Sequence, residues 1–202
     1  MSSEALASQP PRRTRVARLV TDVAGPGYVV IGLLLAVGGH STGSVEGLGW
    51  GLAAAVICGA CPLGVVVLGA RRGWWTDVHV SVREQRLVPL AVAVAANLAG
   101  VGVLLAAHAP RELIAVVLAV LAGLAAGGVI TIWWKISGHT AVAAAAATVL
   151  AAAYGPPLLA AFLALPVIGW SRLALRAHTT AQVTAGALLG VLAGCAIFVP
   201  LR

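Results

Sequence analysis

The chain has 202 residues, of which 60% are hydrophobic and only 9% are charged, and its mean hydropathy is +1.00. Its 13 lysines and arginines and 6 acidic residues are too few to cover the surface of a soluble globule. The hydrophobic residues come in runs of about 20, enough to cross a ~30 Å hydrocarbon core as helices. The composition excludes a soluble protein and predicts an all-α, polytopic transmembrane helical bundle.

The net charge of +7 does not indicate a nucleic-acid partner, because the basic residues lie in short clusters between apolar spans. We expect no nucleic acid and a membrane as the surroundings. Cys58, Cys61 and Cys195 lie inside apolar segments, which argues against a disulfide framework. We interpret Cys58 and Cys61 as helix-packing residues rather than a metal or redox pair.

Residues 1–20 read as a disordered basic tail and residues 21–202 as a single transmembrane domain. Pro110 and Gly155 mark tight turns between helices, and Gly25 begins a break early in the first span. We expect six to seven spans: 22–39, 48–70, 87–108, 111–134, 137–154, 157–170 and 179–199.

Gly186, Gly190 and Gly194 recur at a spacing that lets two helices approach closely in lipid. Gly123 and Gly127 repeat the pattern. Packing within the chain is favoured over a dimer interface, and a homo-oligomer stays open as the alternative.

The basic residues predict the orientation. One side of the seven-span bundle receives Arg12, Arg13, Arg15, Arg18, Arg71, Arg72, Arg83, Arg86, Lys135, Arg172 and Arg176, and the other receives Arg111 and Arg202. Cytoplasmic loops carry the excess of lysine and arginine, so we expect the amino terminus and the loops after spans two, four and six in the cytoplasm.

Three of the five histidines, His79, His139 and His178, fall in those three cytoplasmic connections, each near an arginine or lysine. Two imidazoles beside cations suit phosphoryl transfer, because cations neutralise the phosphate oxygens while one histidine attacks and another protonates the leaving oxygen. His40 and His108 lie at the opposite ends of their spans, with few ionisable neighbours, and we interpret them as solvated or interfacial.

Ser137-Gly138-His139, together with Ser171-Arg172, five residues and His178, resembles the second and third motifs of the type 2 phosphatidic acid phosphatase (PAP2) family. These are integral-membrane lipid phosphatases related to vanadium haloperoxidases. His79, six residues and Arg86 have the spacing of the family's first motif, with histidine in place of its lysine and Leu87 in place of its proline. The resemblance covers about residues 75–200.

The resemblance implies a phosphohistidine mechanism with His178 as nucleophile and His139 as general acid. It implies that Arg86 and Arg172 hold phosphate oxygens, that Ser137 and Gly138 form an anion cradle at a helix start, and that His79, Lys135 and Arg83 assist at the rim. Arg172 and His178 can face one phosphate only if the chain bends between them, and the polar break after residue 170 supplies the bend.

Gln182 stands where the family has an aspartate four residues after the nucleophile. Its carbonyl can orient the His178 ring but brings no charge to stabilise an imidazolium, so an altered or absent activity stays open. Asp77 and Glu84 are candidate substitutes, although pairing with nearby arginines is the favoured interpretation.

We therefore expect a metal-independent phosphoric ester or diphosphate hydrolase, with no cofactor and no metal site, acting on a lipid phosphate with polyprenyl phosphates slightly favoured. The alternative is a catalytically impaired relative that binds lipid headgroups or a partner enzyme. A transporter is disfavoured because the spans lack buried acidic residues.

Overall fold

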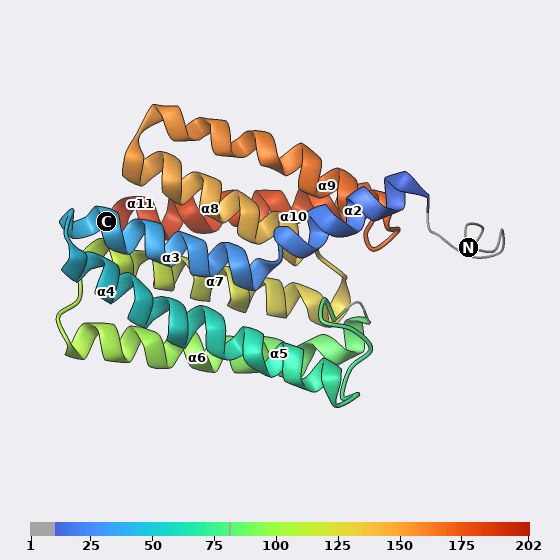
Figure 1. Cartoon of the computed structure of the whole chain (residues 1–202), viewed down its shortest axis with the longest axis horizontal. Helices are drawn as coiled ribbons and strands as arrows, with labels where there is room; N and C mark the ends of the chain where they lie inside the picture. The colour runs from blue at the N-terminus through green and yellow to red at the C-terminus, as the bar shows by residue number, and fades with distance from the viewer. Residues whose placement is uncertain (1–10, 81) are drawn as a thin grey trace, which may run out of the picture.

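The computed structural model describes residues 11–80 and 82–202, and every regular element in this part of the chain is helical (Figure 1). This confirms the expected all-α fold. The elements are α2 (Arg12–Val23), α3 (Pro26–Thr42), α4 (Val45–Ala54), η1 (Ala55–Ala60), α5 (Cys61–Arg71), η2 (Arg83–Arg86), α6 (Leu87–Ala106), α7 (Arg111–Trp133), α8 (Gly138–Tyr154), η3 (Pro156–Leu163), α9 (Ala164–Ala174), α10 (Thr180–Ala193), η4 (Gly194–Phe198) and α11 (Val199–Leu201).

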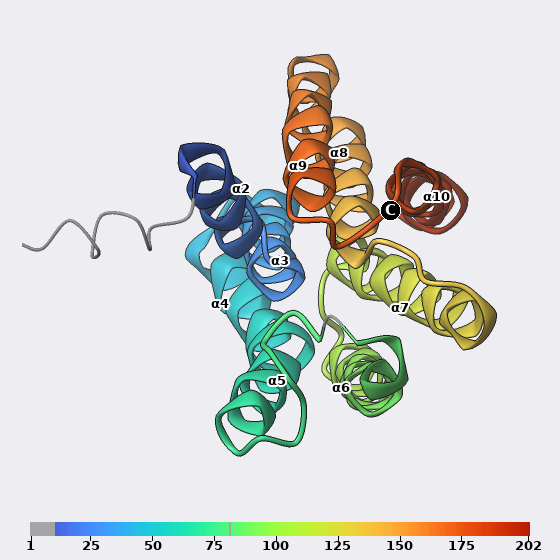
Figure 2. The same ribbon diagram turned by 90° about the vertical axis from the view of Figure 1, so that its right-hand side faces the viewer.

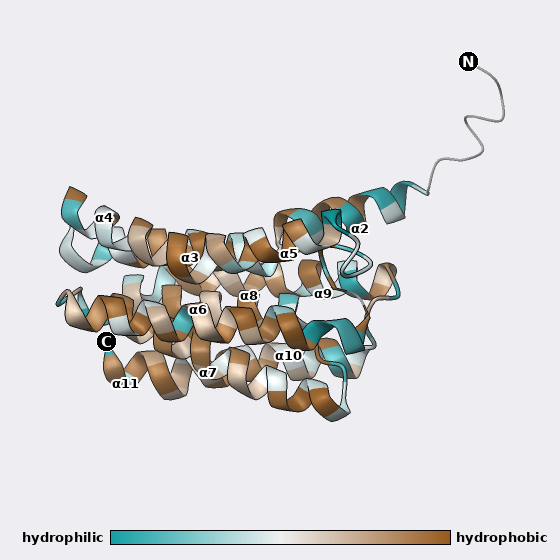
Figure 3. Ribbon diagram, turned by 90° about the horizontal axis from the view of Figure 1, so that it is seen from below, coloured by the Kyte–Doolittle hydropathy of each residue, from teal (hydrophilic) through white to brown (hydrophobic). Residues whose placement is uncertain are grey.

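Within residues 11–80 and 82–202, five helical segments are long and apolar enough to cross a membrane: Val45–Arg71, Arg83–Ala106, Arg111–Trp133, Pro156–Ala174 and Thr180–Leu201. The bent pair of α2 and α3 makes a sixth when counted as one span, and α8 is a shorter apolar helix of 17 residues. Figure 3 shows apolar residues along the helices and hydrophilic residues gathered at the end of the bundle where α2 lies. The protein is a multi-pass membrane protein whose helices match the seven expected segments.

The first span begins much earlier than the sequence predicts. Residues 12–20, expected to be a disordered tail, form most of α2, while residues 1–10 of that expected tail lie outside the described residues. The buried side chains of Ala17 and Thr21 give this helix a packed face against α9, which stabilises it where local sequence does not. The expected break is present, because α2 and α3 meet at a 44° bend with Pro26 at the first position of α3.

The glycine row of α10 packs within the chain. A Cβ on Gly186 would meet the backbone oxygen of Ser137, and one on Gly190 would meet the backbone oxygen of Ala141. Only glycine permits this approach between α8 and α10, which supports the expectation of packing within the chain.

All the connections that carry the candidate residues lie at one end of the bundle. The segments 72–80, 134–137 and 175–179 lie on the right of Figure 1, near α2. Figure 2 looks onto this end and shows α2, α3, α5, α6, α7, α8, α9 and α10 around it. At the opposite end the rings of His40 and Tyr154 lie 4.2 Å apart, far along the helices from the candidate residues.

Candidate functional site

Six of the predicted site residues, five of them with functional side chains, line one cavity of about 390 Å³ at this end of the bundle. They come from three separate parts of the chain: the segment before α6, the first turn of α8, and the end of α9 with the turn that follows it. They are His79, Arg86, His139, Arg172 and His178, and Gly138 lines the same cavity.

The turn after α9 brings Arg172 and His178 together. The backbone N–H groups of Ala177 and His178 both donate to the carbonyl oxygen of Arg172, at 3.0 and 3.3 Å. Arg176 adopts a left-handed backbone conformation within this turn, with φ of 51°. The helix ends at Ala174, so the bend that the spacing requires is present and both side chains reach the cavity.

Gln182 holds the ring of His178. Its side-chain oxygen lies 3.0 Å from His178 Nδ1 and also accepts the backbone N–H of Thr179 at 3.2 Å. Thr179 caps α10 in return by accepting the backbone N–H of Gln182. Because the oxygen is fixed by the Thr179 donor, His178 Nδ1 carries the hydrogen and Nε2 keeps its lone pair.

His178 is buried, and burial lowers the pKa of its imidazole to about 4, with Arg172, Arg86 and Lys135 lowering it further and the bond to Gln182 opposing them. The ring is therefore neutral near pH 7. A neutral ring with a free Nε2 is the form that can attack phosphorus.

His79 and His139 lie ring against ring, with centroids 5.4 Å apart. His79 Nε2 lies 3.5 Å from the carboxylate of Asp22, and Nδ1 lies 3.9 Å from that of Asp77. Desolvation and the charge of Arg172 lower the pKa of His79 more than the two carboxylates raise it. The position of the family's lysine thus holds a group that is largely uncharged at neutral pH.

Two buried nitrogens in the cavity wall have no hydrogen-bond partner: Arg172 Nε and His139 Nε2. The exposed fraction is 3% for Arg172 and 5% for His139. Leaving a buried donor unpaired is costly, more so for a charged group. A phosphate group can satisfy both, because a phosphate oxygen accepts from Arg172 Nε, and a phosphate hydroxyl can donate to His139 Nε2 or a phosphate oxygen accept from it, according to the protonation of the ring.

Arg86 lies in the same wall but is anchored to backbone. Its Nε donates to the carbonyl of Val80 at 2.9 Å and its Nη1 to that of Ile136 at 3.2 Å. Through these bonds Arg86 connects the backbone at Val80 to the backbone at Ile136, and its guanidinium is fixed in place. A guanidinium has five N–H donors, so two bonds do not use all of them.

The structure does not bring Ser137, Lys135 and Arg83 into the cavity wall. The Ser137 hydroxyl accepts the backbone N–H of Thr140 as the cap of α8, which accounts for its place away from the cavity. Arg83 bonds Glu84 and the carbonyl of Ile132 at the surface.

Burial is the larger cause of the lowered pKa of Lys135, and the nearby cations Arg86 and Arg172 lower this pKa further.

The pairing of Glu84 with Arg83 agrees with the favoured interpretation of that carboxylate. Asp77 instead accepts the backbone N–H of His79 at 2.8 Å and lies beside its ring.

Sequence reasoning missed two residues of α2. Asp22 lines the cavity and faces His79, and Thr21 bonds Arg172 at 3.2 Å. The only signal in the sequence is a polar pair at the start of an apolar run, which is an ordinary helix start and carries no information about a distant partner.

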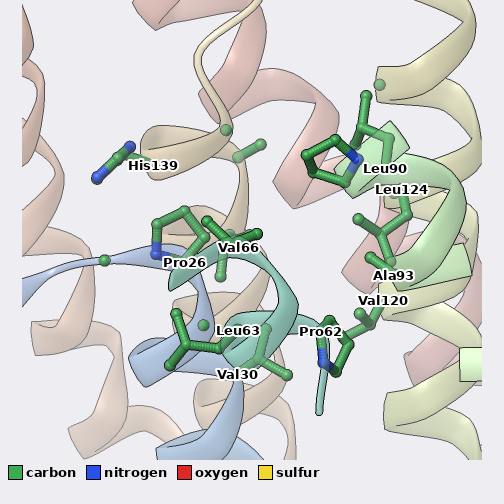
Figure 4. A pocket seen from close by; sticks show the side chains of 18 of the residues that line it. Pro26, Val30, Pro62, Leu63, Val66, Leu90, Ala93, Val120, Leu124 and His139 are labelled. Carbon is green, nitrogen blue, oxygen red and sulfur yellow. The ribbon is translucent and has the colours of Figure 1, made fainter. Parts of the chain in front are cut away.

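Beyond its polar end the cavity is apolar and deep. Figure 4 shows His139 at one side of the cavity and apolar side chains that line the rest of it: Pro26 and Val30 of α3, Pro62, Leu63 and Val66 of α5, Leu90 and Ala93 of α6, and Val120 and Leu124 of α7. On α7 the lining runs from Thr131 to Ala119, which at ~1.5 Å per residue is about 18 Å, more than half of a ~30 Å hydrocarbon core.

Comparison with known proteins gives one finding. No curated protein and no solved structure matches the chain. Residues 132–200 match the family model of the PAP2 superfamily, whose members are generally phosphatases. This segment holds His139, Arg172 and His178, so the resemblance to the PAP2 superfamily seen in the motifs is confirmed over residues 132–200.

Proposed function

We propose that the protein hydrolyses a phosphate monoester or diphosphate of a lipid. The observation that carries the proposal is the cavity itself, which has two unpartnered buried nitrogens at its polar end and an apolar wall beyond. A phosphate group supplies the missing acceptors, and a hydrocarbon chain suits the apolar part.

In the proposed reaction His178 Nε2 attacks phosphorus, forming a P–N bond as the P–O bond to the leaving group breaks. Protonated His139 gives its proton to the leaving oxygen, so that the lipid alcohol, or the lipid monophosphate from a diphosphate, departs neutralised. Water then attacks the phosphohistidine while His139 takes one of its protons, the P–N bond breaks with its electron pair returning to His178 Nε2, and inorganic phosphate leaves. Arg172 and Arg86 stabilise the charge on the remaining phosphate oxygens.

The other predicted residues take supporting roles. Gln182 keeps the productive tautomer of His178, and Gly138 offers its backbone at the amino end of α8. Ser137 acts by capping α8, while Lys135 and Arg83 contribute positive charge from outside the cavity wall. Under this proposal residues 21–202 work as one domain, because α2, α3, α5, α6 and α7 complete a cavity whose polar end lies mostly in the PAP2 segment.

We propose that the site faces the cytoplasm, because the segments at its end of the bundle carry most of the basic residues. A lipid intermediate made in the cytoplasmic leaflet reaches such a site directly, and this slightly favours a polyprenyl phosphate or diphosphate. A cysteine placed at Trp74, in a variant without native cysteines, should resist an impermeant thiol reagent in intact cells and react after lysis. Labelling of intact cells would reverse the proposed orientation.

The decisive experiment measures phosphate release from a panel of lipid phosphates by the purified protein in detergent, with a chelator present. We expect release from at least one lipid, and none after His178→Ala. His40→Ala, at the opposite end of the bundle, is the matched control and should keep full activity. Equal release by His178→Ala would remove His178 from the nucleophile role.

Gln182 favours one second candidate, a catalytically impaired protein that binds lipid headgroups or a partner enzyme. An uncharged amide beside His178 stabilises an imidazolium less than the carboxylate of an aspartate would. Lipid phosphate binding without any phosphate release, in wild type and in Gln182→Asp, would select this candidate over the enzyme.

A further inference from the structure

Thr21 of α2 lies outside the segment that matches the PAP2 superfamily, yet it contacts the predicted phosphate-binding arginine. Its exposed fraction is 2%. Resting on the proposed function, we infer that Thr21 is a positioning residue for the phosphate site, acting through Arg172.

The hydrogen bonds around Thr21 have a defined direction. Ser171 donates its only hydroxyl hydrogen to the carbonyl of Ile168 at 2.7 Å. Thr21 Oγ1 therefore donates to Ser171 Oγ, at 3.2 Å, and its lone pairs accept the N–H of Arg172 Nη1, also at 3.2 Å. The chain of bonds runs from Arg172 through Thr21 and Ser171 to the backbone of α9.

This chain fixes the guanidinium from one side. Arg172 Nη1 is held by Thr21, whereas Nε has no partner and lies in the cavity wall. A guanidinium is planar and rigid, so holding one nitrogen sets the direction of the others. Without the Thr21 acceptor the side chain has to lose more rotational freedom when a phosphate binds.

The backbone of Thr21 also lies close to the ring of His139. One residue thus lies beside both side chains that carry an unpartnered buried nitrogen, Arg172 Nε and His139 Nε2. The packing of α2 against α9, visible in Figure 1 and Figure 2, places Thr21 there. Helix α2 therefore forms part of the site and is more than a membrane anchor.

The test uses inorganic phosphate as the probe and measures its dissociation constant by titration calorimetry on the full-length protein in detergent. Thr21→Val keeps the shape of the side chain and removes the hydroxyl. We expect it to weaken phosphate binding about ten-fold or more, as expected for losing a hydrogen bond to a charged group. Thr21→Ser keeps the hydroxyl and should stay within about three-fold of wild type.

The matched control is Thr148→Val. Thr148 is also a buried helical threonine, but its hydroxyl bonds the carbonyl of Ala144 in its own helix, at 2.9 Å, and it does not line the cavity. The Thr148→Val protein should bind phosphate with the same affinity as the wild-type protein. Thermal unfolding of all variants separates loss of binding from loss of folding.

A double-mutant cycle shows whether Thr21 acts through Arg172. Adding Thr21→Val to Arg172→Ala should cause no further loss of phosphate affinity. A full additional ten-fold loss in that background would overturn the inference, as would equal affinity of Thr21→Val and wild type. Should Thr21→Val unfold, Ser171→Ala breaks the same chain without changing α2, and unchanged phosphate affinity in that variant would overturn the inference equally.

These outcomes separate the two proposals because binding is measured without turnover. If wild type binds no phosphate, the proposed function and the inference fail together. If wild type binds phosphate and Thr21→Val binds it equally well, the inference alone fails.

Discussion

At the scale of single residues, the properties of His178 follow from one carbonyl oxygen. Gln182 Oε1 accepts hydrogen bonds from both Thr179 N–H and His178 Nδ1–H, and this fixes both the orientation and the tautomer of the His178 ring. No negative charge accompanies that oxygen. The site therefore has the geometry of a histidine–carboxylate pair without its electrostatic contribution.

Replacing Gln182 with glutamate should add that charge without changing the length of the side chain. A carboxylate favours the imidazolium, so the pKa of His178 rises from about 4 and the acidic limb of the kcat/KM profile moves toward neutral pH. At pH 7 to 8, where the ring is still largely neutral, kcat should rise about ten-fold. The control Gln182→Met should lower kcat, and a profile identical in wild type and Gln182→Glu would contradict this account.

His79→Lys should place a permanent cation where wild type has a mostly neutral ring. The pKa of His79 is lowered below 6.5, so the wild-type ring becomes positively charged only as the pH falls through this lowered pKa. At pH 8 we expect His79→Lys to bind inorganic phosphate about five-fold more tightly, a gain that shrinks at low pH as His79 itself becomes protonated. His40→Lys adds the same charge at the far end and should leave the affinity unchanged, while a pH-independent gain would argue against titration of His79.

At the scale of elements, the contact of α8 with α10 sets the position of His139 relative to His178. His139 lies in the first turn of α8 and His178 directly precedes the N-cap residue of α10, and the two helices touch where Gly190 faces the backbone of Ala141. Helix α2 closes the site from a third direction through Thr21 and Asp22. The relative position of His139 and His178 thus depends on how closely the backbones of α8 and α10 approach each other.

Gly190→Ala should separate these helices. Its methyl group would overlap the oxygen of Ala141, so we expect a loss of about 1–3 kcal/mol in unfolding free energy together with reduced phosphate affinity. Gly128→Ala is the control, because a Cβ at Gly128 meets no atom within 4 Å. Thermal unfolding in detergent checks both variants, and equal midpoints would show that α8 and α10 have room to adjust.

At the scale of the whole molecule, the bundle joins a cationic end to an apolar interior in one continuous cavity. Three histidines, Arg86, Arg172 and the unpartnered nitrogens lie at one end of the cavity, and the lining beyond them is largely apolar. A ligand that fills the whole space has a phosphate at one end and an apolar chain at the other. We therefore expect the rate of hydrolysis to depend on the length of the apolar chain of the lipid.

Ala93→Phe should shorten the apolar part of the cavity. Excluding about two methylenes at ~0.8 kcal/mol each predicts a loss of about ten-fold in kcat/KM for a long-chain lipid phosphate. A short, soluble phosphomonoester should be hydrolysed at the wild-type rate. Ala95→Phe, which is exposed on the same helix and does not line the cavity, is the control, and an equal effect on both substrates would place the lipid chain elsewhere.

Much of the fold could be predicted from the sequence because each membrane helix is specified locally. Hydrophobic length, Pro110 and Gly155 placed the helices and turns, since the bilayer requires each segment to satisfy its own backbone. The spacing of His139, Arg172 and His178 identified the PAP2 segment, which the family comparison confirms. The contact of Gln182 with His178 was also predicted, although His178 lies just before α10 and meets Gln182 beside the helix cap rather than on a shared helical face.

Only the tertiary structure decided what closes the site. Thr21 contacts Arg172 from 151 residues away, and the helical state of residues 12–20 depends on packing against α9. Ser137, Lys135 and Arg83 fit the motif pattern, yet capping and surface bonds keep Ser137 and Arg83 outside the cavity. The spacing of the motifs indicates which residues lie at the ends of the helices. The partner that each of these side chains contacts depends on how the helices pack, and that packing involves the whole bundle.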